Sequence, residues 1–209
     1  MPNWCSNKVT VRGSVPQAME LVQLMRSDEC VFDFEKILPC PATLHQAVSG
    51  SDEAHYDVKY GNWEQIAGYS WCSEAPKDSR EAFLAWWKTE SRGRVADFDV
   101  LADRYKHNVE TYGHRSWYEW CCEKWGTKWN ASDDAVDVPA DIELLSASGN
   151  TSKKITVTYE FQTAWSPPYP VLHTLAKTFP DLVIKIRWRE EGGNRGSATF
   201  KYEDIQESS

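Results

Sequence analysis

The C-terminal third of the chain constrains the fold most, because its apolar residues recur at every second position. Apolar and polar residues alternate from Ile155 to Phe161 and again from Val183 to Arg189. Successive side chains of a strand point to opposite faces of a sheet, so this alternation predicts two half-buried strands. Between them, Ser166 and the two prolines after it can open a helix over about 169–179, which Pro180 ends.

Shorter signals predict the rest of the sheet. Residues 8–12 (KVTVR) alternate in the same way, and Ser14 can cap a helix that runs to about Arg26. The order strand, helix, strand, strand, helix, strand is that of the split βαβ, or ferredoxin-like, motif, and one more strand follows. We therefore predict an α+β fold: a ferredoxin-like antiparallel sheet (β-α-β-β-α-β plus an extra C-terminal strand) with two helices on one face. The predicted strands cover residues 3–12, 142–147, 154–163, 182–189 and 197–203.

A large insertion must separate the first predicted helix from the second strand. This insertion, residues 28–140, contains 8 of the 11 tryptophans and is expected to be mostly helical. Its predicted helices cover 79–90, 99–112 and 117–125. Residues 41–68 have no firm period and are expected to be mostly loop. We expect a single domain, residues 1–209, in which the insertion packs on a core of residues 1–27 and 141–209.

Charge is unevenly distributed along the 209 residues. The net charge is −8, which argues against phosphate-driven nucleic-acid binding as the first expectation. Residues 28–140 hold 21 acidic and 12 basic side chains, a net of −9, and the remainder has a net of +1. This contrast fits an acidic insertion that docks on the core or contacts a basic partner.

Several functional classes find no support in the sequence. The N-terminus lacks a signal peptide and no apolar run reaches about 18 residues, so we expect a cytoplasmic protein without membrane contact and with reduced thiols. No CxxC or HExxH motif exists, and His107 and His114 lie too far apart in sequence to suggest a metal site. With no GxSxG motif and no P-loop either, we expect no catalytic residue, metal or cofactor, and enzymatic activity is disfavoured.

Two tryptophan-bearing motifs form the first candidate site. KWGTKWNA (residues 124–131) and TAWSPP (residues 163–168) each place a tryptophan where a helix or strand ends, and binding sites often collect at such ends. The side chains could wall a groove with a polar rim, or they could pin the insertion to the core; packing is the favoured interpretation. The candidate groove residues are Trp125, Lys128, Trp129, Asn130 and Trp165.

A basic stripe on the solvent side of the predicted sheet forms the second candidate site. Its residues are Lys8, Arg12, Lys185, Arg187, Arg189 and Lys201. Sheets of this topology bind RNA on the same face in RRM domains, but with exposed aromatic side chains, which the alternation here assigns to the core side. An ordinary polar face, or one covered by the acidic insertion, is therefore favoured over a binding face.

Four motifs, in this order, resemble a known family. They are MPNWCSNKVTVRG at the start, FDFEKILPCP at 32–41, KWGTKWNA at 124–131 and TAWSPPYPVLHTLAKTFPDL at 163–182. Together they resemble the YubB-like ferredoxin-fold family of small proteins carried by phages and plasmids. The resemblance implies the fold and a mobile-element origin, and it implies no activity. The chain departs from the family pattern at Arg195, where an aromatic residue is expected, so the course of the last turn is left open.

The sequence therefore favours a binding or interaction protein of a mobile element, without chemistry of its own. Its expected partner is a host or phage protein, a nucleic-acid-handling or defence complex among them, contacted through the acidic, Trp-rich insertion. One alternative is a nucleotide or single-stranded nucleic-acid binder that uses the sheet face. A second alternative is an enzyme of unrecognised type in the Trp-lined groove. The sequence does not indicate an oligomeric state.

Overall fold

Two compact units make up the chain in the computed structural model, which describes residues 3–46, 50–90, 97–139 and 153–206. One unit combines Met1–Pro39 with Cys121–Ser209 and contains the sheet; the other, Cys40–Trp120, is helical. Their boundaries differ from the predicted limits of the insertion, because the segments 28–39 and 121–139 belong to the sheet unit. That the helical part packs on the core to form a single domain stays a prediction.

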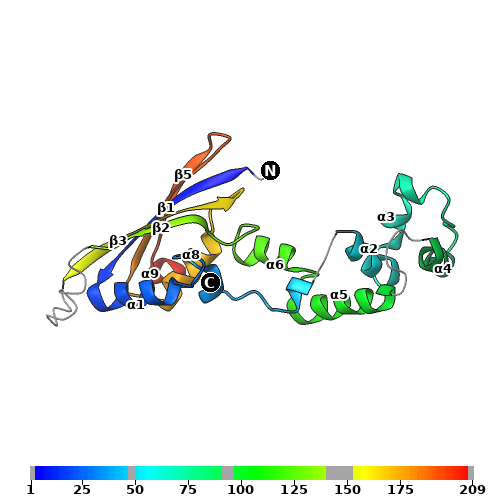
Figure 1. Ribbon diagram of the computed structural model, residues 1–209, viewed down its shortest axis with the longest axis horizontal. Coiled ribbons are helices and arrows are strands. Elements are labelled where there is room, and N and C mark those ends of the chain that lie inside the picture. The colour runs from blue at the N-terminus through cyan, green and yellow to red at the C-terminus, as the bar shows by residue number, and fades with distance from the viewer. Residues whose placement is uncertain (1–2, 47–49, 91–96, 140–152, 207–209) are drawn as a thin grey trace. The chain divides into compact units, whose positions relative to one another are not determined.

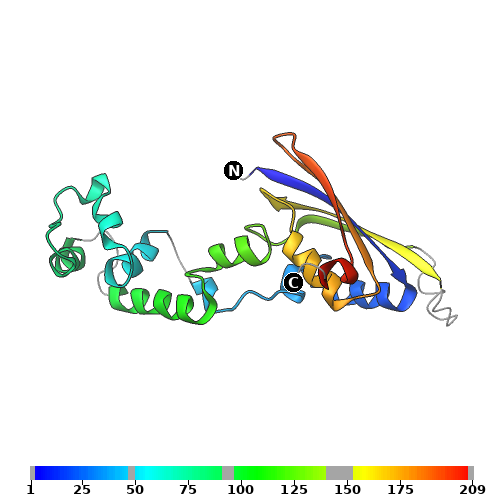
Figure 2. The same cartoon turned by 180° about the vertical axis from the view of Figure 1, so that it is seen from behind.

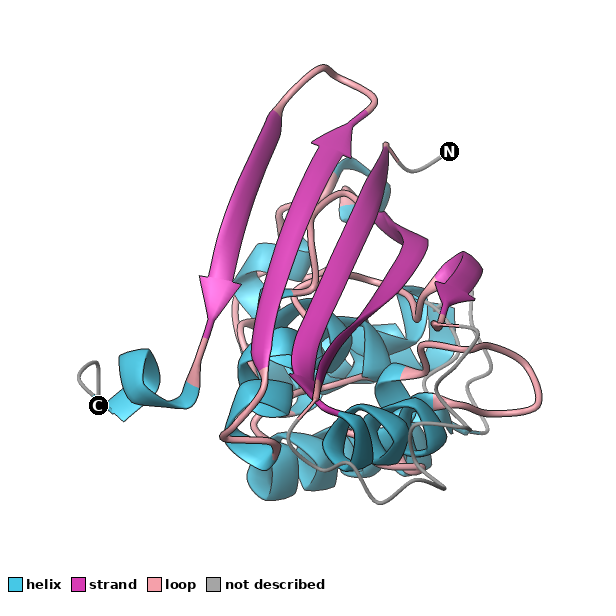
Figure 3. Ribbon diagram, turned by 90° about the vertical axis from the view of Figure 1, so that its left-hand side faces the viewer, coloured by secondary structure: helices cyan, strands magenta, loops and turns pink. Residues whose placement is uncertain are grey.

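The sheet has five antiparallel strands in the order β2-β3-β1-β4-β5 (Figure 3). The strands are β1 (Trp4–Ser14), β2 (Ser132–Asp137), β3 (Lys154–Ala164), β4 (Val183–Glu190) and β5 (Arg195–Phe200). β3 lies between the mutually parallel β1 and β2, and β1 lies between the mutually parallel β3 and β4. Each pair is thus a split βαβ unit. This arrangement confirms the predicted α+β fold with a ferredoxin-like sheet and an extra C-terminal strand.

One face of the sheet is covered by two helices, α1 and α8 (Figures 1 and 2). α1 (Val15–Met25) packs against β1 and β3, and α8 (Tyr169–Thr178) packs against β4 and β5. Their apolar stripes meet the inward side chains of the strands, whose predicted alternation the structure confirms. A short helix, α9 (Tyr202–Gln206), follows β5.

The strand beside β3 differs from the predicted one. Residues 142–147 lie outside the described residues, and the place next to β3 is filled by β2, about ten positions earlier in the chain, where Val136 pairs with Tyr159. β2 has the sequence SDDAVD, and aspartate is depleted in strands. Its local sequence therefore gives little sign of a strand, and pairing with β3 stabilises it instead.

The segment that precedes the helical unit completes the core of the sheet. Phe32 stacks on Phe161 of β3, with ring centroids 4.9 Å apart and planes 15° apart, and Phe34 of η1 (Phe34–Lys36) meets the same ring edge-on. The backbone N–H groups of Val31 and Phe32 both donate to the Asp134 carboxylate of β2. The motif FDFEK is therefore part of the sheet unit rather than of an insertion.

The helical unit has its own aromatic core. Its helices are η2 (Leu44–Gln46), α2 (Gly50–Lys59), α3 (Trp63–Ala67), η3 (Ser70–Cys72), α4 (Arg80–Glu90) and α5 (Phe98–Tyr112), and α6 (Trp117–Lys124) crosses its boundary at residue 120. The predicted helices over 79–90, 99–112 and 117–125 are confirmed. The prediction of mostly loop for 41–68 is wrong, because α2 and α3 are short and carry too few apolar residues to show a period.

Tryptophans in the helical unit serve mainly as packing residues. Trp63 and Trp87 are buried around Phe83, and the Trp87 indole N–H donates to His55 Nδ1 at 3.0 Å. Their burial assigns them to the core of this unit. Among the described residues, no helix combines the length and the apolar composition that crossing a membrane would require.

Candidate ligand-binding face of the sheet

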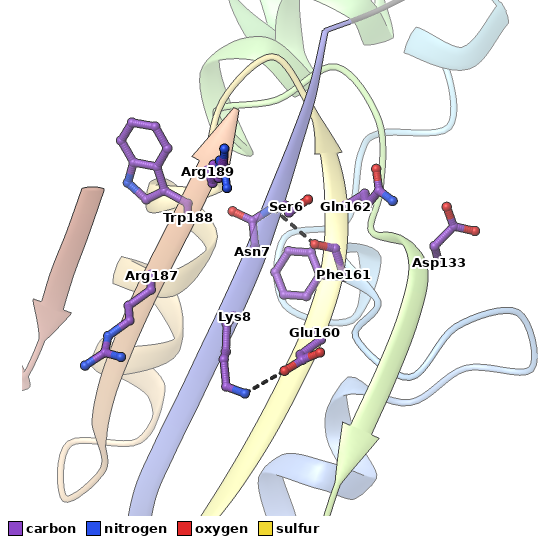
Figure 4. A pocket seen from close by; sticks show the side chains of 10 residues that line it. All are labelled: Ser6, Asn7, Lys8, Asp133, Glu160, Phe161, Gln162, Arg187, Trp188 and Arg189. Atoms are coloured by element: carbon purple, nitrogen blue, oxygen red, sulfur yellow. Dashed lines mark hydrogen bonds and ion pairs between the residues drawn. The ribbon is translucent and has the colours of Figure 1, made fainter. Parts of the chain in front are cut away.

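The outer face of the sheet, on the side away from α1 and α8, carries polar side chains and is hollowed. One hollow of about 440 Å³ extends over β1, β3 and β4, with Asp133 of β2 at its side (Figure 4). Two more, of about 210 and 360 Å³, lie on β1 and β4 and on β4 and β5. Lys8, Lys185 and Arg187 line at least one hollow each, and Arg187 lines all three. The first of these hollows is open to solvent, and the second is the most enclosed of the three.

Five of the six residues of the predicted basic stripe lie exposed on this outer face. Lys8 and Arg12 project from β1, and Lys185, Arg187 and Arg189 project from β4. Lys201 does not belong with them, because β5 ends at Phe200 and Lys201 is half-buried between β5 and α9. The stripe as the structure shows it therefore follows two neighbouring strands, β1 and β4.

Arg195 is a basic residue of this face that the sequence analysis left out. It is the first residue of β5, it is exposed, and it pairs directly with Arg189 of β4. The chain reverses before it through residues 190–194, where Gly193 has a φ of 93° that favours glycine. The alternation Arg195, Ser197, Thr199 already marked it as outward-facing, so the signal was present in the sequence.

Like charges stand directly opposite each other on this face. Lys8 pairs with Arg187 across β1 and β4, and Arg189 pairs with Arg195 across β4 and β5. Lys8 also meets Glu160 of β3, with Nζ 2.6 Å from the carboxylate, as Figure 4 shows. Within the described ranges, no side-chain hydrogen bond or ion pair neutralises Arg187, Arg189 or Arg195. Opposed like charges destabilise a sheet, so this arrangement costs the fold stability.

Acidic residues mark the opposite side of the same face. Asp133 and Asp137 of β2 are exposed, and Asp133 has a φ of 48° at a register shift between Ser132 and Ala135. With Glu160 of β3, they give the β2 side a negative charge, whereas β1, β4 and β5 are basic. The face is thus polarised across its strands, and an anion would bind on the side of β1, β4 and β5.

The predicted groove residues separate into two groups. Trp129 and Trp165 are exposed by 37% and 39%, and the Lys128 ammonium lies over both indole rings, 4.6 and 5.8 Å from their centroids. Trp4, which the prediction did not include, contacts Trp129 at a centroid distance of 5.9 Å. We call Trp4, Lys128, Trp129 and Trp165 the tryptophan cluster.

Trp125 and Asn130, by contrast, have structural roles. Trp125 is buried and its indole N–H donates to the Leu38 carbonyl at 2.8 Å. The Asn130 side-chain oxygen accepts the backbone N–H groups of Phe34 and Ala131, each at 2.9 Å, and its amide donates to Asp33. These two side chains therefore help to hold residues 33–38 in place, in line with packing, the favoured interpretation of these motifs.

Hydrogen bonds between the two motifs hold the tryptophan cluster in place. Thr127 Oγ1 donates to the Ala164 carbonyl at 2.8 Å, and Ser166 Oγ donates to the Gly126 carbonyl at 2.5 Å. Gly126 has a φ of 77°, and an added Cβ would lie 2.8 Å from Pro170, so only glycine fits there. KWGTKWNA and TAWSPP, which are distant in sequence, thus form one structural element.

The tryptophan cluster and the hollow of about 440 Å³ share strand β1. Trp4 precedes Ser6 and Lys8 by two and four positions on β1, so all three share the outward side of that strand, and Ser6 and Lys8 line the hollow. Four residues of a strand span about 13 Å. The aromatic rings and the basic side chains therefore belong to one continuous surface.

Potential metal ligands and thiols give no further candidate site among the described residues. The part of the chain that the structure describes holds no cluster of three or more His, Cys, Asp or Glu side chains that could bind a metal ion. All six cysteines are free thiols, and burial raises the pKa of Cys5 to about 11, which keeps it as the unreactive thiol.

An open antiparallel sheet with helices on one face and a polar, partly basic outer face defines a ferredoxin-like fold. In agreement with this class, residues 124–209 match the family model of the ferredoxin-like domain in Api92-like protein. Over these residues the chain is similar to that ferredoxin-like domain.

A solved structure, that of the protein Api92 from Yersinia pseudotuberculosis, is similar along the chain. The two share 12% sequence identity, the match covers 98% of this chain and 96% of that one, and the TM-score is 0.47. No curated protein matches the chain.

Proposed function

We propose that the protein is a non-enzymatic binding protein whose outer sheet face binds single-stranded nucleic acid through its phosphate backbone. One observation carries this proposal: Arg187, Arg189 and Arg195 stand beside other cations and face no carboxylate among the described residues. Repulsion between these neighbouring cations reduces the stability of the fold, and a polyanion bound across the strands would neutralise their charges.

The shape of the face favours an extended ligand. The hollows adjoin one another over four strands, and the one over β1, β3 and β4 is open, whereas sites for small molecules enclose most of their ligand. Single strands bind to open sheets and grooves that combine basic side chains with aromatic rings, and here the tryptophan cluster supplies the rings. The aromatic side chains that the sequence analysis found missing from this face are present at its end.

The net charge of −8 does not oppose this proposal, because the relevant charges are local. Backbone binding depends on the cations that reach the phosphates, and the acidic side of β2 would keep the strand over β1, β4 and β5. We therefore expect moderate affinity with a strong dependence on salt concentration.

Fluorescence anisotropy with labelled oligonucleotides tests the proposal. We expect Arg187→Gln/Arg189→Gln to weaken binding of a thymidine oligonucleotide at least tenfold at 50 mM salt. The slope of log K against log salt should become shallower by about 1.4, since each lost phosphate contact removes about 0.7 for single strands. The matched control Lys77→Gln/Lys177→Gln removes the same charge from exposed positions elsewhere and should bind as the wild type does. Equal losses in both double variants would reject the sheet face as the site.

A protein partner is the second candidate, and one observation favours it. Tyr69 and Trp71 of the helical unit are exposed by 44% and 47%, and their rings stack with centroids 5.8 Å apart and planes 18° apart. Exposed aromatic pairs are frequent anchors of interfaces, and a basic host or phage protein would suit the acidic residues nearby in sequence, Glu64 and Glu74. Pull-downs that compare the wild type with Trp71→Ala test this candidate: it requires a protein that the variant fails to retain.

Charge separation between core and insertion no longer supports the second candidate. With the observed boundaries, residues 40–120 contain 13 acidic and 9 basic side chains, and the rest contains 18 and 14. Both units thus have a net charge of −4, in place of the predicted contrast of −9 and +1. The exposed aromatic pair is what remains in favour of a contact through the helical unit.

The biological setting that we propose is a mobile genetic element acting in the host cytoplasm. The four motifs that resemble the YubB-like family support the phage or plasmid origin. Single-stranded nucleic acid and the proteins that handle it are ligands that such an element meets inside the cell. The third alternative, an enzyme in the Trp-lined groove, has no supporting group among the described side chains.

A further inference from the structure

The tryptophan cluster has two properties that packing alone does not require. Its two outer rings, Trp129 and Trp165, remain more than one-third exposed, whereas Trp63 and Trp87 of the helical unit are buried. Trp165 has a φ of 73°, a conformation that glycine adopts readily and a bulky residue rarely does. Strained residues of this kind concentrate at functional sites.

The strained residue is fixed from several directions. The Trp165 backbone N–H donates to the Asn3 carbonyl at 2.8 Å, and Thr163 Oγ1 donates to the Ser166 carbonyl at 2.7 Å. The start of β1 is fixed in turn by Glu191, whose carboxylate accepts the Trp4 backbone N–H and whose own N–H donates to the Trp4 carbonyl, both at 3.0 Å. The rings are therefore presented on a preorganised frame, which lowers the entropic cost of binding.

Lys128 occupies the position that a ligand would take. Its ammonium group lies over both exposed rings, and a contact of this kind is weak at an exposed site. Stacking of a nucleobase on an aromatic ring is the stronger interaction, so a base can compete with the ammonium group for the faces of these rings.

We infer that Trp129 and Trp165, with Trp4 behind and Lys128 at the side, form a subsite that stacks an unpaired base of a strand whose backbone lies on the sheet face. This inference rests on the proposed function and adds selectivity to it. A paired base in a duplex is stacked within its helix and cannot enter, so the subsite distinguishes single strands from duplexes. Stacking uses the π-face that every base has, so the subsite tolerates any sequence.

Two ring-removing variants test the subsite. Trp129→Ala removes one ring, and Trp165→Gly removes the other while placing at φ 73° the residue that tolerates it. We expect each to weaken binding of a thymidine oligonucleotide 5- to 100-fold with the salt slope unchanged. An abasic oligonucleotide of the same length, with the same phosphates and no bases, should bind both variants as it binds the wild type.

The abasic oligonucleotide separates the two proposals. If the wild type binds neither oligonucleotide, the proposed function fails. If the folded variants bind the thymidine oligonucleotide as tightly as the wild type does, or lose affinity equally for the abasic one, the stacking subsite is rejected and the backbone site stands. Thermal melting checks that each variant is folded.

A measurement on the unaltered protein guards against variants that fail to fold. 2-Aminopurine placed at successive positions of the oligonucleotide reports stacking through the quenching of its fluorescence. We expect strong quenching at one position, next to the tryptophan cluster, and weak quenching at the others. Uniform quenching along the strand would overturn the inference.

Discussion

The two compact units have the same net charge, −4, and use their cations in opposite ways. In the helical unit, Lys59 bridges Asp99 and Asp103 at 2.9 and 2.7 Å, and Arg115 meets Asp57 at 2.8 Å. On the outer sheet face, Arg187, Arg189 and Arg195 stand beside other cations instead. Net charge therefore says little about what each unit can bind, and the pairing of individual charges says much more.

Their aromatic residues differ in a similar way. Trp63, Phe83 and Trp87 fill the core of the helical unit, whereas the rings of Trp129 and Trp165 are presented at the end of the sheet. Abundant tryptophan is therefore mostly a packing device in the helical unit and, in our proposal, part of a binding site in the sheet unit. The predictions below test this division.

Removing a core ring of the helical unit should have the largest effect on stability. Phe83 is fully buried among the rings of Trp63, Trp86 and Trp87, so Phe83→Ala should lower the free energy of unfolding by about 3–5 kcal/mol. Urea denaturation measures this change. Oligonucleotide affinity per folded molecule should stay that of the wild type; a parallel loss of affinity would show that the division between packing and binding is wrong.

Removing the Asn130 side chain should lower the free energy of unfolding by less than Phe83→Ala does, because Asn130 stabilises the fold through hydrogen bonds. Asn130→Ala deprives the N–H groups of Phe34 and Ala131 of their acceptor, which should reduce stability by about 1–3 kcal/mol. Asn194→Ala, which removes only an exposed hydrogen bond to Glu190, is the matched control and should change little. If Asn130→Ala melts like the wild type and binds oligonucleotides less tightly, Asn130 belongs to the site after all.

Acid should weaken the ion-pair network of the helical unit. Hydrogen bonds from Lys59 lower the pKa of both Asp99 and Asp103 in the folded protein. A carboxyl group with a lowered pKa stabilises the fold above its unfolded pKa, and this contribution is lost as the pH falls through the lowered value. Both carboxylates are more than half exposed, so the loss between pH 5 and pH 2 should be at most about 1 kcal/mol.

Comparison of urea denaturation at these pH values checks the acid effect. The variant Asp99→Asn/Asp103→Asn lacks both titrating groups, so its stability should depend less on pH over this range. If the stability of this variant depends on pH as strongly as that of the wild type, other groups cause the acid sensitivity and the Lys59 ion pairs do not.

Neutralising Glu160 should give the smallest effect on stability and a gain in binding. The Lys8–Glu160 pair is exposed, so Glu160→Gln should cost about 0.2–1 kcal/mol of stability. It leaves Lys8 as another unneutralised cation of the outer face, which should raise oligonucleotide affinity two- to fivefold at 50 mM salt. Weaker binding in this variant would contradict the proposed path of the phosphates across β1 and β4.

Strong local patterns made most of the sheet predictable. β1, β3 and β4 carry clear alternation, and α1 and α8 carry apolar stripes with a proline in the first turn, so local sequence and tertiary structure agree there. The predicted caps are wrong: Ser14 makes no capping hydrogen bond to α1, and Pro168 rather than Ser166 precedes α8. The strand that could not be predicted was β2. Its aspartates form contacts that the local sequence does not show: Asp134 accepts two backbone N–H groups more than a hundred positions earlier in the chain.

The sequence identified many residues of the candidate site, but it did not show which of them lie together in the fold. Periodicity placed Lys8, Arg187 and Arg189 on one face, but Trp4 could be assigned to the site only when the fold brought it against Trp129. For the same reason the sequence could not separate Asn130 from Lys128, since the partners of Asn130 lie about a hundred positions earlier in the chain.

The geometry of β2 bears on how copies of the protein meet in concentrated solution. A sheet edge offers unpaired backbone groups to any strand that approaches, which is a common start of aggregation. Three features of β2 hinder the pairing of another strand with this edge. β2 is short, its register is irregular between Ser132 and Ala135, and its aspartates repel a second copy of the same strand. Any association of this sheet through its edges would therefore proceed by β5, at the opposite side.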